Sequence, residues 1–356
     1  MYHSFTIKNF RCFRDLTLEP LERVNLITGK NNVGKTALLE AMFLHLGASN
    51  PTLPLRVNVI RGLERFAIDA RELWGWLFLG RNTKEMIQLA GQDADETTRS
   101  LSIRLVEPET TQLTPSNGGA LSHSASEGLT TASGILELLL EYRDSRSQLV
   151  TTRVSLTPEG ELSARREGNA SLPFGVYLST RARFLLEDAG RFSNLERVGR
   201  HEMFLPTLQL LEARLRRLAV LVTGGVPIIN GDIGIGELIP LPLMGEGMVR
   251  LLSIMLAIAN APDGIVLVDE VENGLHHSVM MGVWQAIADL ARQYRTQVFA
   301  TTHSWECIQA AHRAFEASGT YDFRLHRLDR IGEDVRAVGY DREMLATSTE
   351  MNLEVR

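Results

Sequence analysis

The chain has few cysteines, no long apolar run and no excess of basic residues. Its two cysteines, Cys12 and Cys307, are too few for a zinc cluster and indicate reduced thiols. The longest apolar run, 251–259, is too short to cross a bilayer. Charged residues near the N-terminus leave no apolar signal core, so we expect a cytoplasmic protein. A net charge of −6 excludes a surface that attracts nucleic acid everywhere, and DNA contact would need a local basic patch.

The chain of 356 residues is long enough for one large or two ordinary domains, with 44% hydrophobic and 22% charged residues. The stretch 29–36 reads Gly-Lys-Asn-Asn-Val-Gly-Lys-Thr and fits the phosphate-binding loop pattern. An apolar run, 24–28, precedes it and predicts a buried strand, while 36–46 predicts a helix that stops at Gly47. Because a chance glycine turn would lack both neighbours, we favour a phosphate site.

The glycines of this loop let backbone N–H groups turn towards phosphates, and the start of the helix adds its positive end. Lys35 would reach the β- and γ-phosphates, and the hydroxyl of Thr36 would hold Mg²⁺. The predicted nucleotide-binding residues of the loop are Gly29, Asn31, Asn32, Val33, Gly34, Lys35 and Thr36.

A second apolar run, 265–268, ends in Asp269 and Glu270 and suits a central parallel strand. Its acidic end would lie at the carboxyl edge of the sheet, where α/β proteins bind ligands. Asp269 is placed to hold Mg²⁺, and Glu270 to orient or deprotonate the attacking water. A strand that merely ends in surface acids is the alternative, and the phosphate loop makes it the weaker one.

The next predicted strand, 297–301, is followed by Thr302, His303 and Ser304, of which Ser304 can cap a helix. A single histidine is more often structural than functional. At the tip of a strand beside the acidic pair, however, His303 is within reach of a γ-phosphate. We therefore predict a catalytic role for it.

The rest of the chain predicts an α/β fold with a mixed central sheet, an inserted antiparallel β region and a helical lobe. Alternating runs at 101–106, 135–142 and 149–156 indicate strands, with a loop at 109–134. Helices interrupted near Pro206 are predicted for 183–221. Many arginines balanced by acids there indicate a solvated face, with a DNA-facing or partner-facing patch as the alternative. The predicted units are a nucleotide-binding core (1–48 and 262–340), the inserted β region (49–175), the helical lobe (176–261) and a C-terminal tail (341–356).

These motifs in this order resemble the ABC-type ATPase heads of the SMC, RecF and OLD-like group, also called AAA15-like. Residues 7–13 resemble the opening strand of that group, and 29–36 its phosphate loop. Residues 269–276 resemble its Asp-Glu element with the loop that faces a second head, and 301–304 its switch histidine. The resemblance covers residues 1–48 and 240–330 and matches the middle only in outline.

In such ATPases two heads enclose two nucleotides, and a signature helix of one head points at the γ-phosphate held by the other. The resemblance places this signature at Gly245 and Gly247, with Arg250 a turn later, although the customary serine is absent. Gln88 and Gln92 are the candidates for the glutamine that closes over the site.

The resemblance implies an ATPase that uses ATP and Mg²⁺, with Lys35, Glu270 and His303 as catalytic residues. It implies a homodimer or larger oligomer that controls a nucleic-acid-processing or antiphage-defence complex, or DNA repair, with possible DNA contact. Few residues follow the last predicted strand, so a nuclease or other effector would be a separate protein. The alternatives are a nucleotide-gated clamp with little hydrolysis, a transporter ATP subunit and a small-molecule kinase.

Overall fold

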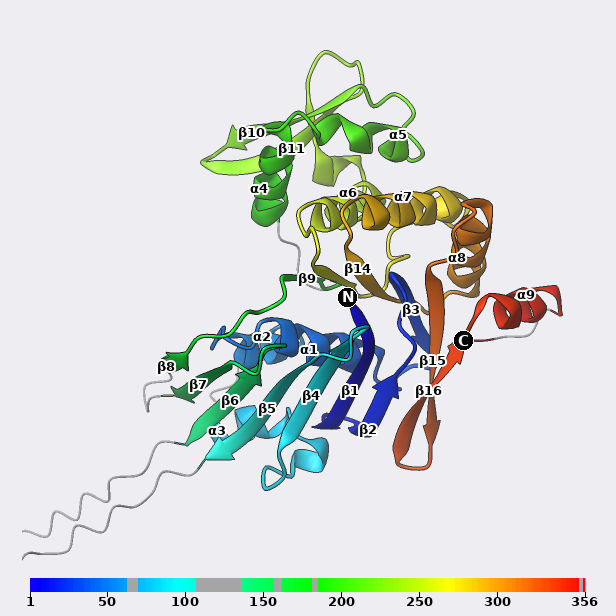
Figure 1. Ribbon diagram of the computed structural model, residues 1–356. Coiled ribbons are helices and arrows are strands. Elements are labelled where there is room, and N and C mark those ends of the chain that lie inside the picture. The colour runs from blue at the N-terminus through cyan, green and yellow to red at the C-terminus, as the bar shows by residue number, and fades with distance from the viewer. Residues whose placement is uncertain (63–69, 107–135, 157–161, 181–184, 352–354, 356) are drawn as a thin grey trace, which may run out of the picture.

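The computed structural model describes residues 1–62, 70–106, 136–156, 162–180, 185–351 and 355 (Figure 1). The strands are β1 (Tyr2–Phe10), β2 (Phe13–Leu18), β3 (Val24–Gly29), β4 (Ile87–Asp93), β5 (Thr98–Val106), β6 (Glu137–Arg143), β7 (Leu149–Leu156), β8 (Leu162–Gly168), β9 (Gly175–Leu178), β10 (Arg217–Thr223), β11 (Val226–Asp232), β12 (Ile239–Pro240), β13 (Ile265–Val268), β14 (Gln297–Thr301), β15 (Phe323–Ile331) and β16 (Asp334–Tyr340). The α-helices are α1 (Lys35–Leu46), α2 (Leu53–Val59), α3 (Ala70–Gly75), α4 (Leu185–Glu196), α5 (Leu205–Leu208), α6 (Glu246–Ala259), α7 (Met280–Gln293), α8 (Trp305–Ala317) and α9 (Arg342–Glu350). Short 3₁₀ turns are η1 (Leu79–Arg81), η2 (His201–Phe204), η3 (Leu241–Met244) and η4 (His277–Val279).

The core sheet has the strand order β16-β15-β3-β14-β13-β9, and all its pairs are parallel except β15 with β16. Every residue of β3, β13 and β14 is buried. Alternate residues explain this burial: Val266 and Val268 pack on one side with α6 to α8, whereas Leu267 packs on the other side with α1. A strand covered on both faces reads as a continuous apolar run, which is why the sequence predicted these strands.

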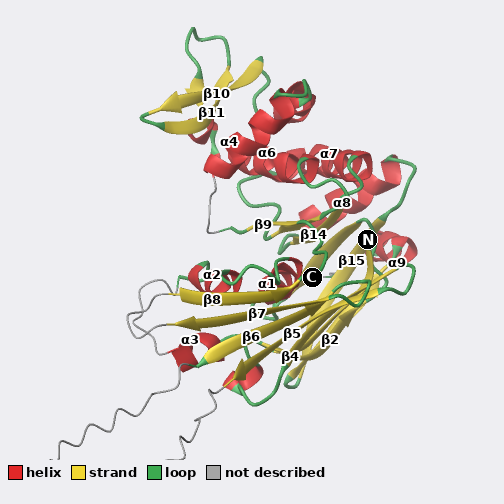
Figure 2. Cartoon of the chain, turned by 60° about the vertical axis from the view of Figure 1, so that its left-hand side comes forward, coloured by secondary structure: helices red, strands yellow, loops and turns green. Residues whose placement is uncertain are grey.

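The larger sheet is antiparallel, with the order β2-β1-β4-β5-β6-β7-β8. It lies on the far side of α1 from the core sheet, so α1 is sandwiched between two sheets (Figures 1 and 2). The inserted strands do not form a unit of their own. The sequence assigned β1 and β2 to the core, but β1 pairs with β4, as in the register of Ile7 with Leu89, and β2 pairs with β1. The predicted boundary at residue 48 therefore cuts through one sheet, and the predicted loop at 109–134 lies outside the described residues.

The lobe above the core sheet carries α4, α5 and a small sheet of β10, β11 and β12 (Figure 1). The prediction of helices up to residue 221 is wrong at its end, because 217–223 is a strand paired with β11. Leu218 and Ile229 are buried there, so pairing between the two strands outweighs local helical preference. The predicted boundary between residues 175 and 176 is also wrong, because it divides β9 between the inserted β region and the helical lobe. β9 pairs with β13 and belongs to the core sheet.

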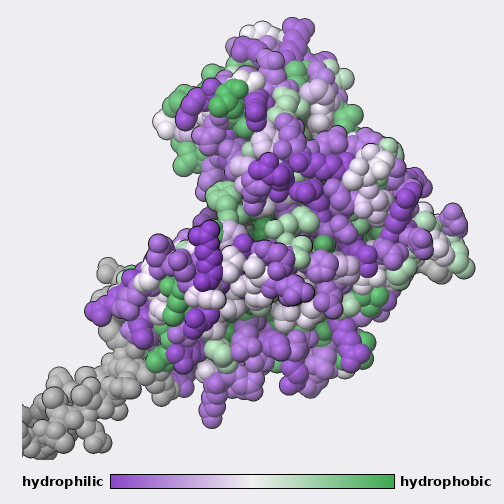
Figure 3. Space-filling model, viewed as in Figure 1, coloured by the Kyte–Doolittle hydropathy of each residue, from purple (hydrophilic) through white to green (hydrophobic). Residues whose placement is uncertain are grey.

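The predicted C-terminal tail, 341–356, contains the helix α9. Asp341 caps α9 by accepting a hydrogen bond from the backbone N–H of Met344 at 3.0 Å. Leu345 is fully buried in the core beside α8, so the segment packs on the nucleotide-binding half. On the face seen in Figure 3, hydrophilic side chains predominate, and the outline narrows between the β10–β11 lobe and the body below.

The helix α1 carries a buried histidine that makes the fold sensitive to acid. His45 is fully buried, with Nδ1 3.2 Å from the Tyr2 hydroxyl and Nε2 3.1 Å from the Arg99 carbonyl oxygen. Burial lowers the pKa of His45 to about 4, whereas an unfolded histidine titrates near 6.5. Between these values the unfolded chain binds the proton first, so this contribution to stability is complete above pH 6.5 and declines as pH falls towards 4.

We expect the wild-type protein to lose about 2 kcal/mol of unfolding free energy through His45 between neutral pH and pH 5. Denaturant titrations at pH 7.5 and 5 measure this loss. His45→Gln, which does not titrate, should lose less over the same interval, whatever it costs at pH 7.5. His277→Gln, on an exposed residue, is the control and should keep the wild-type pH dependence. The expectation is contradicted if His45→Gln and the wild type lose the same unfolding free energy between pH 7.5 and 5.

Candidate nucleotide-binding site

The phosphate loop joins β3 to α1, and its glycines are required by close neighbours. Gly29 and Gly34 have φ of +137° and +117°, where side chains are strained. A Cβ on Gly29 would lie 2.5 Å from the carbonyl oxygen of Leu328, and one on Gly34 would lie 2.7 Å from Sγ of Cys12. Gly34 is also the N-cap of α1. The first N–H groups of α1, which have no acceptor within the helix, therefore point into the loop.

Lys35 lies across this loop. Its ammonium donates hydrogen bonds to the carbonyl oxygens of Gly29 at 2.5 Å and Lys30 at 3.1 Å. Burial lowers the pKa of Lys35, and the nearby carboxylates of Asp269, Glu270 and Glu272 act in the opposite direction. The loop thus holds a cation at the point where a polyphosphate would enter.

Thr36 and Asp269 meet although 233 positions separate them. The Thr36 hydroxyl lies 3.1 and 3.2 Å from the two carboxylate oxygens of Asp269, and Thr301 Oγ1 donates to the same carboxylate at 2.8 Å. Asp269 is buried at the end of β13, next to β14. A hydroxyl and a carboxylate are hard oxygen donors, which Mg²⁺ prefers, so these two residues fit the predicted metal site.

Glu270 and His303 face each other at the ends of β13 and β14. His303 Nε2 is 3.3 Å from Glu270 Oε1, and the two side chains are 40% and 41% exposed. Their backbones are fixed: the Glu270 N–H donates to Thr301 Oγ1 and the His303 N–H to Glu272 Oε1, each at 2.8 Å. Glu270 has φ of 52°, a left-handed value that is uncommon for a residue other than glycine. Both groups are therefore held by the scaffold and open to solvent.

One cavity of about 830 Å³ joins these groups. From the predicted site its lining contains Asn31, Asn32, Gly34, Lys35, Thr36, Asp269, Glu270 and His303. Gly245 and Gly247 are not part of this lining among the residues that the structure describes. The structure thus brings together the two strand ends and the phosphate loop, and it separates them from the predicted signature.

The start of α6 is packed differently at its two glycines. Gly245 is exposed, and a Cβ there would meet no atom within 4 Å. Gly247 is buried, and a Cβ there would lie 2.4 Å from the carbonyl oxygen of Gly274 in the same chain. The glycine at 247 therefore serves a contact between α6 and the loop after Glu270. Only Gly245 leaves its α-carbon open to another molecule.

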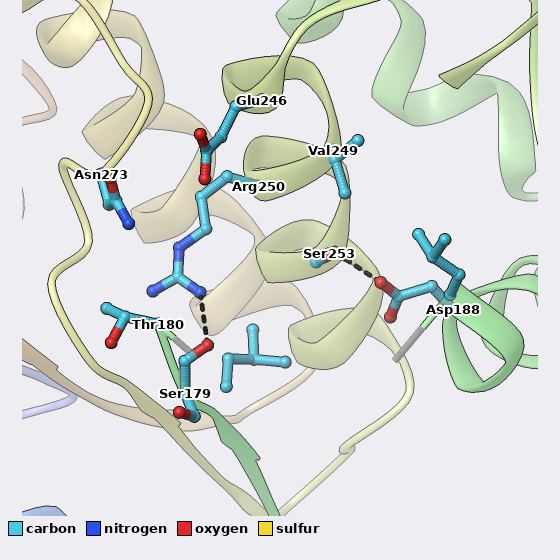
Figure 4. A pocket seen from close by; sticks show the side chains of 10 residues that line it. Ser179, Thr180, Asp188, Glu246, Val249, Arg250, Ser253 and Asn273 are labelled. Carbon is cyan, nitrogen blue, oxygen red and sulfur yellow. Dashed lines mark hydrogen bonds between the residues drawn. The ribbon is translucent and has the colours of Figure 1, made fainter. Parts of the chain in front are cut away.

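Arg250 ties α6 to the residues that follow β9 and β13, and Figure 4 shows its bond to Ser179. Its guanidinium donates to the carbonyl oxygens of Ser179 at 3.5 Å, Glu270 at 3.3 Å and Asp269. Burial lowers the pKa of Arg250, and the charges of Asp269 and Glu270 oppose this effect. A cation that bonds to backbone carbonyls fixes the ends of β9 and β13 relative to α6.

Two family models match the chain over overlapping stretches. A model described as "AAA domain" matches residues 4–168, and one described as "AAA domain, putative AbiEii toxin, Type IV TA system" matches residues 151–306. Together they contain the phosphate loop and the elements that carry Glu270 and His303. The chain is an SMC/RecF-like P-loop ATPase.

Several known proteins are similar to this ATPase. It is 23% identical over 329 residues to an "ATP/GTP phosphatase" of Helicobacter pylori, which covers 87% of each chain. It is 29% identical over 117 residues to "DNA replication and repair protein RecF" of Idiomarina loihiensis, covering 31% of this chain and 33% of the relative. A solved SMC head bound to the C-winged helix domain of ScpA matches with a TM-score of 0.49 and 11% identity, covering 97% and 99%. No helix among the described residues of the ATPase is long and apolar enough to cross a membrane.

The predicted glutamine candidates lie away from the cavity. Gln88 and Gln92 are on β4, where Gln92 accepts a hydrogen bond from Ser4 at 3.5 Å, and neither lines the cavity. In the ATPase the lining beside β13 comes instead from Ser179 and Thr180, just after β9. Parallel pairing of β9 with β13 brings them there. The buried run before Ser179 was a signal in the sequence, but the run did not show which strand it pairs with.

Sequence reasoning also missed a buried charge cluster beside the loop. Glu40 of α1 is fully buried, and Arg61 binds both its oxygens at 2.7 and 3.0 Å. Arg11, from the turn between β1 and β2, forms an ion pair with Glu40 at 2.8 Å. Both arginines line the cavity of the ATPase. A polar residue inside an apolar helix was the available signal, and the arginines that neutralise it are distant in sequence.

Proposed function

We propose that this ATPase closes around ATP as a dimer and that closure controls a nucleic-acid-processing or antiphage-defence complex with a separate effector or nuclease. The observation that carries the dimer is the separation of the start of α6 from the cavity of its own chain. The exposed N-terminus of α6 at Gly245 suits an anion, yet the described lining of its own phosphate cavity contains no α6 residue. A second copy would supply the phosphate that this helix faces.

Within each site the geometry supports the following roles. Lys35 would exchange its two carbonyl contacts for the β- and γ-phosphates, and the backbone N–H groups of the loop would cradle the same oxygens. Thr36 and Asp269 would hold Mg²⁺, which neutralises charge on the transferred phosphoryl group. Glu270 would take the proton of the attacking water, and His303, 3.3 Å away, would orient Glu270 and contact the γ-phosphate.

The nucleic-acid setting rests on relatives. One relative is named for DNA replication and repair, and one family model is described by a toxin–antitoxin system. The net charge of −6 limits direct DNA contact to a local patch. Three arginines of the upper lobe are paired with acids: Arg191 with Asp188 at 2.7 Å, Arg214 with Glu212 at 2.9 Å and Arg217 with Asp232 at 3.4 Å. A protein effector is therefore our preferred partner, with DNA contact as a secondary possibility.

The test mixes two inactive variants. Lys35→Ala damages the phosphate loop, and Gly245→Asp places a carboxylate where α6 would meet the phosphate of the second copy. Each variant alone should lose hydrolysis, because every composite site carries one lesion. In a mixed dimer both lesions fall on one site and the other site is intact. Random association should then restore roughly a quarter of the parental rate, since half the dimers are mixed and each has one good site.

Gly236→Asp is the matched control for backbone strain. Gly236 has φ of +93°, and a Cβ there, as at Gly245, would meet no atom within 4 Å, but Gly236 lies between β11 and β12. This variant should keep its activity. If mixing restores nothing, either the two sites of the dimer are strictly coupled or Gly245 does not mark the signature. Two copies linked in one chain, with one composite site intact, distinguish these explanations. An inactive linked pair, or an active Gly245→Asp, would contradict the proposal.

A further inference from the structure

The cavity extends beyond the phosphate loop to an aromatic segment. Trp76, Phe78, Gly80 and Arg81, between α3 and the end of η1, line the same cavity as Lys35 and Glu270. In this segment Trp74, Leu77 and Phe78 are almost completely buried, whereas Trp76 is 46% exposed. A half-exposed tryptophan that lines a cavity beside a phosphate loop offers its ring to a ligand bound there.

The segment is anchored to the phosphate loop through the first hairpin. The backbone N–H of Arg11 donates to the carbonyl oxygen of Leu77 at 2.8 Å, and Phe10 forms an isolated β-bridge with Phe78. Cys12, the next residue of the same turn, packs against Gly34. A short rigid path therefore connects Trp76 to the phosphate loop, which fixes the distance between an aromatic surface and a phosphate site.

Arg81 fixes the tryptophan ring. The guanidinium carbon of Arg81 is 4.7 Å from the centroid of the Trp76 ring, and Glu72 of α3 pairs with the same guanidinium at 3.6 Å. Both Gly80 and Arg81 have left-handed backbones, with φ of 58° and 62°. For arginine this conformation is uncommon and costs energy, and here it accompanies the stacked position of the side chain.

We propose that Trp76 is the platform on which the nucleobase stacks, with Arg81 holding the ring in place. This inference rests on the proposed binding of a nucleoside triphosphate by the phosphate loop. An aromatic ring accepts any base because every base has a π-face. The platform would thus favour purines by their larger stacking area without reading their edges, and it would bind ATP and GTP alike. Trp76 acts on affinity for the base and takes no part in hydrolysis.

The test separates the base from the phosphates. Calorimetric titrations with ATP, GTP and inorganic tripolyphosphate, each with Mg²⁺, are compared for wild type, Trp76→Ala and Trp76→Phe. We expect Trp76→Ala to weaken both nucleotides by about 5- to 150-fold, the range found for loss of one base stack. Tripolyphosphate, which has no base, should bind as before, and Trp76→Phe should recover most of the nucleotide affinity. KM should rise with little change in kcat.

Two further variants make the outcomes distinguishable. Phe174→Ala removes an aromatic ring that is 57% exposed and does not line the cavity, and it should change nothing. Lys35→Ala should weaken all three ligands. Unchanged ATP and GTP affinity in Trp76→Ala, or an equal loss for tripolyphosphate, would overturn the platform while leaving the phosphate site in place. Unchanged tripolyphosphate binding in Lys35→Ala would overturn the proposed function itself.

Discussion

Glu270→Gln is expected to bind ATP and to hydrolyse it about 10²- to 10⁴-fold more slowly than the parent. The amide keeps the size of the carboxylate and can still contact His303, which lies 3.3 Å from Glu270 in the parent. It cannot accept the proton of the attacking water. Since the backbone at this position is fixed by Thr301 and by Arg250, the substitution should change the chemistry and leave the loop in place.

The oligomeric state of Glu270→Gln tests the dimer as well. Because the γ-phosphate would persist, the variant should elute as a dimer in ATP and as the parental species without nucleotide. Glu306→Gln, on an exposed carboxylate of α8 that does not line the cavity, is the control and should hydrolyse ATP normally. If Glu270→Gln elutes at the same volume with and without ATP, the hypothesis that ATP controls dimerisation is wrong. A parent as slow as Glu270→Gln would instead favour the nucleotide-gated clamp.

Lys35→Ala should weaken ATP binding by about 10²- to 10⁴-fold, because it removes two charge-assisted contacts worth roughly 1.5–3 kcal/mol each. The ammonium is buried across the loop in the parent, bonded to the carbonyl oxygens of Gly29 and Lys30. ATP raises the melting temperature of a protein that binds it, and this rise should disappear in the variant. The circular dichroism spectrum should stay unchanged.

Lys30→Ala is the matched control for this experiment. Lys30 lies in the same loop, its side chain is exposed, and it contributes only its carbonyl oxygen to Lys35. Substitution there removes an equal charge from the same stretch of chain. We expect ATP to stabilise Lys30→Ala as it does the parent. Equal losses in the two variants would show that general charge, and not the position of Lys35, governs binding.

The sequence alone determined the parts of this protein that are encoded by neighbouring residues. Strand, loop and helix around Gly34 are contiguous, so their geometry follows from local glycine conformations and a helix start. The runs ending at Asp269 and Thr301 were also predictable, because a strand buried on both faces is apolar at nearly every position. Parallel pairing of such strands places their ends at one edge, and this suffices to bring Glu270 beside His303.

The tertiary structure decided what depends on partners distant in the chain. β1 continues into the inserted sheet because its register matches β4, and residues 217–223 are a strand because β11 lies beside them. The close approach of Gly247 to Gly274 makes that glycine an internal contact, which a motif cannot reveal. The segment of Trp76 is held at the cavity by residues distant in sequence, through the bond between Arg11 and Leu77 and the bridge between Phe10 and Phe78. In each case, contacts between distant residues select one of several locally allowed conformations or strand pairings. The hydrophobic periodicity of the sequence does not indicate which one is selected.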